Sequence, residues 1–302
     1  MRTLLLFLSL LLAGCGPSAA PGGNGATGPK FVKTGTLESR KLDEASGLQA
    51  GDNGVLYTHN DHGSTIFVID ETGRNLGELT VRGASNRDWE DITRVMGEAG
   101  PMLVVGDVGD NLGVRKDVRL YFIDEPAAGN YTDDLVVRHK VDIRYPDGPR
   151  DVESIAYDPA SDSILMLSKR DHPPRLYSVP LDLALWEEEV EATFLAELPE
   201  LRPPTRKDLL LHPKNGMWIS QATGMDISAD GRTAAVITYR SLYLFTRGAD
   251  ETWPEAFQRP PVEYVGPPGS DEEAVAFGPE PGTVYITTEG RPAPIYRFEP
   301  GL

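Results

Sequence analysis

Acidic side chains recur at equivalent places in repeated segments of this sequence. Five segments run from polar residues into an apolar anchor, and the position two before each anchor carries Ser46, Glu90, Glu153, Met225 and Glu273 in chain order. Repeats arranged around one axis would bring three carboxylates and a hydroxyl together, where like charges repel unless a cation or water separates them. An oxygen-only ligand set without His or Cys favours Ca²⁺. The predicted metal ligands are Glu90, Glu153, Glu273 and Ser46.

A water-filled channel is the alternative interpretation, in which these side chains cap strand ends and hydrogen-bond to the neighbouring backbone. Met225, in the fourth segment, is a poor ligand for a hard cation. The positions four before the anchors are also mostly acidic, which suits outer support of a metal site or the capping of turns. These residues are Glu44, Asp88, Asp151 and Asp271.

A second set of polar residues follows the second β-rich run of each segment. Both charges are present, which suits an anionic ligand held partly through a metal, such as a phosphate ester or an acidic sugar. Structural salt bridges between neighbouring repeats are the alternative. The predicted ligand-binding residues are Asp61, Asp107, Lys169, Arg240 and Glu289.

Two further clusters have chemistry-bearing residues. His59 and His62 flank Asp61, a pattern that fits an acid/base pair or a zinc site. The 106–111 segment, Gly-Asp-Val-Gly-Asp-Asn, looks like a phosphate-cradling or calcium loop, although no helix follows it and the EF-hand spacing is absent. The sequence has no Gly-x-Ser-x-Gly elbow, His-Glu-x-x-His, P-loop or dinucleotide motif, so no motif predicts a reaction.

The elements that position these residues are expected to be short strands. The chain has 31 Gly and 25 Pro between runs of Val, Ile, Leu and Tyr, and helix is expected only over 183–190. Each of the five segments has an anchor run, a second β-rich run and a third run with an aromatic residue at the same place. This periodicity predicts an all-β, five-bladed β-propeller, since a four-stranded blade takes roughly 40 to 45 residues.

The middle two intervals between anchors are longer than one blade, so insertions are expected over 106–117 and 202–218. A degenerate sixth blade within 202–218 is the alternative. The last segment lacks an outer strand because only four residues follow its third run. Residues 31–37, Phe-Val-Lys-Thr-Gly-Thr-Leu, are therefore predicted to close the ring as its N-terminal strand, which leaves few free edges.

The N-terminus has the pattern of a bacterial lipoprotein signal. Residues 1–14 combine a positive start with an apolar run too short to span a bilayer, and small residues precede Cys15. We expect cleavage before Cys15 and lipidation of its thiol, which would anchor the protein to a membrane outside the cytoplasm. If the organism has an outer membrane, Gly16 favours sorting to it. Residues 15–30 are then the lipidated cysteine and a flexible tether, and residues 31–302 the propeller domain.

Composition limits the partners. The net charge of −17 opposes binding to phosphate backbones, so no nucleic acid partner is expected. A solvated, self-repelling surface accounts for most of that charge. Because Cys15 is the only cysteine, the domain has no internal disulfide, and we expect a monomer whose ligand is an unidentified small molecule or protein.

The repeat resembles the SdiA-regulated family of secreted propellers over roughly residues 38–302. The matching segments are 46–48, 153–158 with 167–169, 273–277 with 285–289, and 295–298. This resemblance implies an acidic channel with calcium as a candidate occupant. A weaker likeness is to calcium-activated nucleotidases and phytase-like propellers, which place Glu and Ser from successive blades around a central metal.

We therefore expect a lipid-anchored binding or interaction module with calcium in its channel. The alternative is a calcium-dependent hydrolase of phosphate esters or anhydrides. In that alternative Glu90, Glu153 and Glu273 hold the metal, the metal activates water, and Lys169 or Arg240 stabilises negative charge. Fold class alone does not choose between the two functions.

Overall fold

The computed structural model describes residues 28–211, 213, 216–268 and 271–300. The predicted signal peptide, Cys15 and most of the predicted tether lie outside the described residues. Among the helices described, none is both long and apolar enough to cross a lipid bilayer. The described chain is mostly β-strand, and its helices are the short α1 (Leu181–Trp186), α2 (Arg206–Leu211) and α3 (Trp253–Ala256).

The strands form four-stranded antiparallel runs, which we number as blades in chain order of their innermost strands. Blade 1 contains β2 (Ala45–Ala50), β3 (Val55–Asn60), β4 (Thr65–Asp70) and β5 (Asn75–Arg82). Blade 2 contains β6 (Trp89–Gly97), β7 (Gly100–Asp107), β8 (Val118–Asp124) and β9 (Leu135–Arg144). Blade 3 contains β10 (Val152–Asp158), β11 (Ser163–Ser168), β12 (Arg175–Pro180) and β14 (Thr193–Glu197).

Blade 4 contains β15 (Ala222–Ile227), β16 (Thr233–Thr238), β17 (Ser241–Thr246) and β18 (Val262–Val265). Blade 5 contains β19 (Glu272–Phe277), β20 (Val284–Thr288), β21 (Pro294–Glu299) and β1 (Lys30–Thr36). A short parallel pairing of β5 with β9 joins the outer edges of blades 1 and 2, and the short β13 (Glu189–Glu191) also pairs with β9 in parallel.

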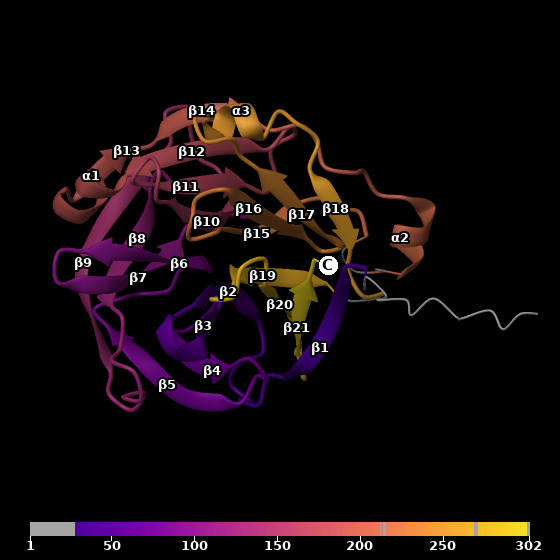
Figure 1. Ribbon diagram of the computed structural model, residues 1–302. Helices are drawn as coiled ribbons and strands as arrows, with labels where there is room; N and C mark the ends of the chain where they lie inside the picture. Colours follow the sequence, from indigo (N-terminus) through magenta and orange to yellow (C-terminus); the bar gives the residue numbers. More distant parts are fainter. Residues whose placement is uncertain (1–27, 212, 214–215, 269–270, 301–302) are drawn as a thin grey trace, which may run out of the picture.

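The innermost strands close into a ring. β2, β6, β10, β15 and β19 contact one another in that cyclic order, and β19 in turn contacts β2. Figure 1 shows these five strands around the centre of the molecule, with β5, β9, β14, β18 and β1 at the rim. Radial sheets arranged around a common axis define a β-propeller. The predicted all-β propeller fold is therefore confirmed.

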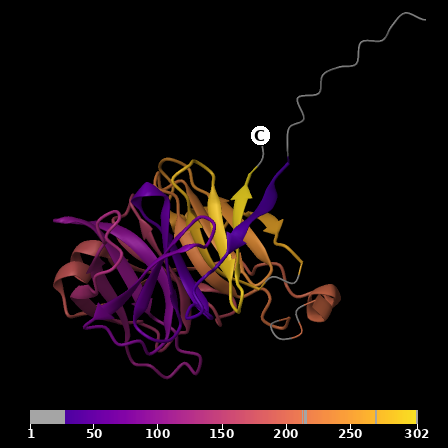
Figure 2. The same cartoon turned by 90° about the horizontal axis from the view of Figure 1, so that it is seen from below.

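The N-terminal strand closes the ring as predicted. β1 pairs antiparallel with β21, from Lys30 opposite Glu299 to Thr36 opposite Pro294. Phe31 packs on Phe298 across this pair with ring centroids 5.1 Å apart. Figure 2 shows the indigo β1 beside the yellow strands of blade 5. Strands from the two ends of the described chain thus share one sheet.

The hydrophobic core lies between neighbouring blades. Five buried apolar clusters each combine residues of two adjacent blades, so every blade is covered on both faces. The third-run aromatics behave as predicted in four blades, since Phe67, Tyr121, Tyr177 and Tyr243 are buried. Tyr296 is half-buried. Stacked sheet faces explain why the strands are rich in Val, Ile and Leu.

The two predicted insertions are loops on one end of the ring. The 108–117 segment joins β7 to β8. Within 202–218 the described residues form α2 and turns, with no strand among them. The helix expected over 183–190 is α1, which lies slightly earlier because the chain re-enters a strand at Glu189.

Candidate functional site

Each innermost strand has a β-bulge at the same position. The register of the first two strands skips one residue in every blade, and the skipped residue is left without a partner on the second strand. A bulge adds local twist and re-aims the extra side chain. The bulged residues are Ser46, Glu90, Glu153, Thr223 and Glu273. Four of them are the predicted metal ligands.

The fourth bulged residue is Thr223, not Met225. In blade 4 the register skips between Ala222 and Gly224, so Met225 is equivalent to the apolar anchors and is fully buried. The Thr223 hydroxyl donates a hydrogen bond of 2.8 Å to the carbonyl of Glu272 in blade 5. The prediction that Met225 is the fourth equivalent of Ser46 and Glu90 was therefore wrong by two residues. The match of Thr-Gly-Met at 223–225 with Ser-Gly-Leu at 46–48 is the signal that would have corrected it.

Lys169, at the end of the second strand of blade 3, lies among these carboxylates. Its ammonium forms a buried ion pair with Glu153 and donates a hydrogen bond of 2.9 Å to the hydroxyl of Tyr239 from blade 4. Burial alone would lower the pKa of Lys169, but the carboxylates of Glu153 and Glu273 raise it. A cation thus links blades 3 and 4 at one mouth of the channel, which we call the channel mouth, and its charge also acts on Glu273 of blade 5.

Glu90 and Glu153 are electrostatically coupled at the channel mouth. Both are buried, and the hydroxyl of Ser46 donates to Glu90 Oε2 at 3.1 Å. Burial and then the charge of Glu153 raise the pKa of Glu90 well above its usual value. Burial raises the pKa of Glu153 to about 7, and the adjacent Lys169 opposes that rise. The predicted convergence of carboxylates from separate blades is therefore present.

Glu273 adds a third buried carboxylate from blade 5. Its Oε1 atom is buried and has no hydrogen-bond partner. Burial raises the pKa of Glu273. The Lys169 ammonium opposes this rise, and the charge of Glu289 adds to it. Burial also raises the pKa of Glu289, on which the charges of Asp61 and Glu44 act as well. The set of neighbouring acidic side chains thus extends from the buried channel to the exposed rim.

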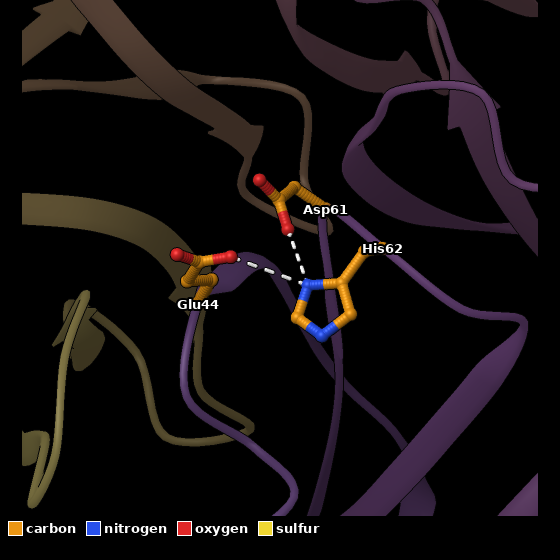
Figure 3. Close-up of side chains that lie close together, drawn as sticks. All are labelled: Glu44, Asp61 and His62. Atoms are coloured by element: carbon orange, nitrogen blue, oxygen red, sulfur yellow. Dashed lines mark hydrogen bonds and ion pairs between the residues drawn. The ribbon is translucent and has the colours of Figure 1, made fainter.

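At that rim, His62 lies between two carboxylates from the same blade. Its Nδ1 is 2.8 Å from Asp61 Oδ1 and 3.2 Å from Glu44 Oε2. Figure 3 shows both carboxylates next to this nitrogen. Among the described residues, only these three place one metal-ligand atom each within 4.8 Å of one another. Glu90, Glu153 and Glu273 do not form so tight a group, and the Lys169 ammonium pairs with Glu153 while its charge also acts on Glu273.

Two of the predicted ligand-binding residues are bound within the scaffold. Asp107 Oδ1 accepts from Arg115 Nη1 at 3.0 Å and from the backbone N–H of Asp88 at 3.1 Å. Arg240 donates to Asp208 Oδ2 at 2.9 Å and so holds α2 against blade 4. Asp61, Lys169 and Glu289 lie together at the channel mouth. Asp107 and Arg240 form structural ion pairs, but these join Asp107 to a loop of its own blade and Arg240 to α2, not one repeat to the next as the alternative predicted.

The two further clusters of the sequence also separate. The His59 ring is fully buried against Trp89, with centroids 5.5 Å apart, and burial lowers its pKa to about 4. It therefore does not join His62. In the 106–111 segment, Gly109 passes so close to Glu90 that a Cβ there would lie 2.2 Å from Oε1. The segment packs over the channel carboxylate instead of forming an open anion cradle.

A second acidic layer lies deeper in the ring and was not predicted. Asp91 accepts backbone N–H groups of its own neighbour Ile92 and of Ile155 in blade 3, both at 2.9 Å. Asp226 does the same with Ile227 at 2.8 Å and with Phe277 of blade 5 at 2.7 Å. Each carboxylate therefore connects two blades. Burial raises the pKa of Asp226 to about 7 and that of Asp91 well above its usual value.

Comparisons with known proteins add little to this geometry. No family model and no curated protein matches the chain. A solved gluconolactonase from Xanthomonas campestris is similar over 89% of each chain, with 11% sequence identity and a TM-score of 0.44. The assignment of the chain as a β-propeller rests on its own strand topology. The resemblance to the SdiA-regulated family stays a prediction.

Proposed function

We propose that the protein is an envelope-displayed binding module whose channel mouth binds a divalent cation, with Ca²⁺ as the preferred ion. The supporting observation is the buried excess of carboxylates over the single Lys169 ammonium, together with the unpartnered Oε1 of Glu273. Burying carboxylates near one another is unfavourable unless protons or cations neutralise them. Oxygen-only ligands from Glu90, Glu153, Glu273 and Ser46 suit Ca²⁺, and the Thr223 hydroxyl completes the five equivalent positions.

In this proposal Lys169 competes with the ion. Its ammonium neutralises Glu153 and also acts on Glu273, so we expect the ion to bind nearest Glu90. The lipid on Cys15 would anchor this module to a membrane, and the ion at the mouth would serve either as a structural element or as a contact for an anionic ligand.

Calorimetric titration of residues 28–302 with Ca²⁺ after EDTA treatment tests the proposal. Glu90→Gln should weaken binding at least tenfold, because it removes a charged ligand. Lys169→Met should strengthen binding, because it removes the competing charge. His62→Gln, which alters only the rim cluster, should leave the affinity within twofold.

The thermal midpoint should rise with Ca²⁺ in the wild type, since a ligand that binds only the folded state stabilises it. Unchanged Ca²⁺ affinity in Glu90→Gln, or a loss of binding only in His62→Gln, would exclude the channel carboxylates. Absence of any binding to the folded wild type would exclude the proposal altogether.

Hydrolysis of phosphate esters or anhydrides is the second candidate. The observation that favours it is the contact of Lys169 with Tyr239 and with Glu153, whose pKa of about 7 suits proton transfer near neutral pH. Ca²⁺-dependent release of nitrophenol from p-nitrophenyl phosphate, lost in Glu153→Gln, would support this function. Ca²⁺ binding with no hydrolysis of phosphate esters or nucleotides would exclude the hydrolase and support the binding module.

A further inference from the structure

A separate pocket lies at the opposite end of the ring from Lys169. Its volume is about 320 Å³. Residues at the ends of the innermost strands of all five blades line it. Its walls are largely apolar and include Val95, Ile227, Phe277 and Pro279. A pocket of this size that combines apolar walls with converging polar groups is typical of small-ligand sites.

One buried charged group lines this rear pocket without a cationic partner. Asp226 is only 6% exposed, and its carboxylate accepts two backbone N–H groups. None of the ion pairs found among the described residues includes Asp226. A carboxylate can accept more hydrogen bonds than the two it receives here.

Among the described residues, Arg94 is the one basic side chain that lines the pocket, and it is already paired. Arg94 Nη2 lies 2.8 Å from Asp52 Oδ2, and its Nε lies 2.6 Å from Glu125 Oε2. Arg94 is thus shared between Asp52, which is also part of the lining, and Glu125, so it leaves no positive charge for Asp226. The rear pocket as a whole therefore keeps the negative charge of Asp226 beside apolar walls.

We propose that the rear pocket binds a small organic ammonium ligand, whose cationic group pairs with Asp226 and whose apolar body contacts Val95, Ile227 and Phe277. A buried carboxylate discriminates by charge, because a neutral ligand of equal shape leaves it without a counter-ion. An organic ammonium group fits this pocket better than a bare metal ion does, because a hard metal ion needs several oxygen ligands and the walls are largely apolar. This site is independent of the Ca²⁺ proposal for the channel mouth.

Calorimetry with benzylamine and benzyl alcohol at pH 8 tests the inference. Benzylamine is protonated at that pH, and benzyl alcohol has nearly the same shape without the charge. We expect the wild type to bind benzylamine at least tenfold more tightly than benzyl alcohol. Asp226→Asn should reduce the affinity for benzylamine to that for benzyl alcohol.

A second variant covers the case in which Asp226→Asn weakens the fold. Ala229 is exposed at the rim of the rear pocket, so Ala229→Trp should block entry and weaken both ligands without altering the core. Glu153→Gln at the channel mouth should not change benzylamine binding, and Ca²⁺ titrations of Ala229→Trp should match the wild type.

Equal affinities for the amine and the alcohol would overturn the inference, as would unchanged benzylamine binding in Ala229→Trp. Loss of benzylamine binding in Glu153→Gln would place the amine at the channel mouth instead. Undetectable benzylamine binding to the folded wild type would also overturn it, and the Ca²⁺ titration would still decide the first proposal separately.

Discussion

Single residues at the five bulges have different tasks despite their equivalent places. Glu90, Glu153 and Glu273 bring negative charge into the channel, whereas Ser46 and Thr223 donate hydrogen bonds to Glu90 and to the carbonyl of Glu272. The hydroxyl positions therefore support the structure around the carboxylates. Lys169 pairs with Glu153, and its charge also acts on Glu273, which lowers the cost of burying these two carboxylates.

Thr223→Val should reduce the free energy of unfolding by about 1–3 kcal/mol, because it keeps the shape but removes the hydroxyl that donates to the buried Glu272 carbonyl. Met225→Leu, two residues away in the same strand, is the matched control and should cost less than about 1.5 kcal/mol. Urea unfolding measures both. A larger cost for Met225→Leu than for Thr223→Val would contradict the revised register of blade 4.

At the scale of elements, the bulge and the closing strand are the devices on which the site depends. The bulge directs one side chain of each innermost strand into the channel, and β1 completes blade 5, which supplies Glu273. Without β1, the edge of β21 and the ring of Phe298 would be exposed, and an open strand edge promotes association.

A chain beginning at residue 38 should therefore unfold at a lower temperature than one beginning at residue 28, and should form soluble aggregates. Thermal unfolding and size-exclusion chromatography measure the two effects. The longer chain retains the pairing of β1 with β21 and serves as the control. Equal melting temperatures and a monomeric elution of the shorter chain would show that the ring does not need this strand.

At the scale of the whole molecule, burying so many carboxyls makes stability depend on pH. The folded-state pKa of Glu153 and of Asp226 is about 7, above the usual values of 4.5 and 3.8. At a pH between the unfolded-state and folded-state pKa values, the folded protein binds more protons than the unfolded chain does. The free energy of unfolding therefore falls as the pH rises to and through about 7. His59, whose pKa burial lowers to about 4, is neutral in the folded state but still partly protonated in the unfolded state at pH 6.5, so it offsets only a small part of the fall.

The free energy of unfolding should therefore fall by about 1–2 kcal/mol between pH 6.5 and pH 8. Urea titrations at the two pH values measure the change. Glu153→Gln and Asp226→Asn should each reduce this pH dependence, because an amide does not titrate. Stability that rises over this interval would mean that both carboxyls are ionised well below pH 7.

The sequence by itself determined the architecture. Repeated β-rich runs predicted the propeller, the missing outer strand of the last repeat predicted closure by residues 31–37, and the recurring carboxylates of Glu90, Glu153 and Glu273 predicted an acidic channel. These features follow from local composition and spacing, which a single sequence contains. The lipoprotein signal and Cys15 also belong to the sequence and stay predictions.

Only the tertiary structure decided which groups meet. The register of the fourth repeat was ambiguous because a shift of two residues returns every side chain to the same face of a strand, so alternation alone cannot detect it. The position of Lys169 among the carboxylates, the use of Arg240 to hold α2, and the rear pocket at Asp226 all depend on contacts between blades. Such contacts join residues far apart in the chain, and no local pattern specifies them.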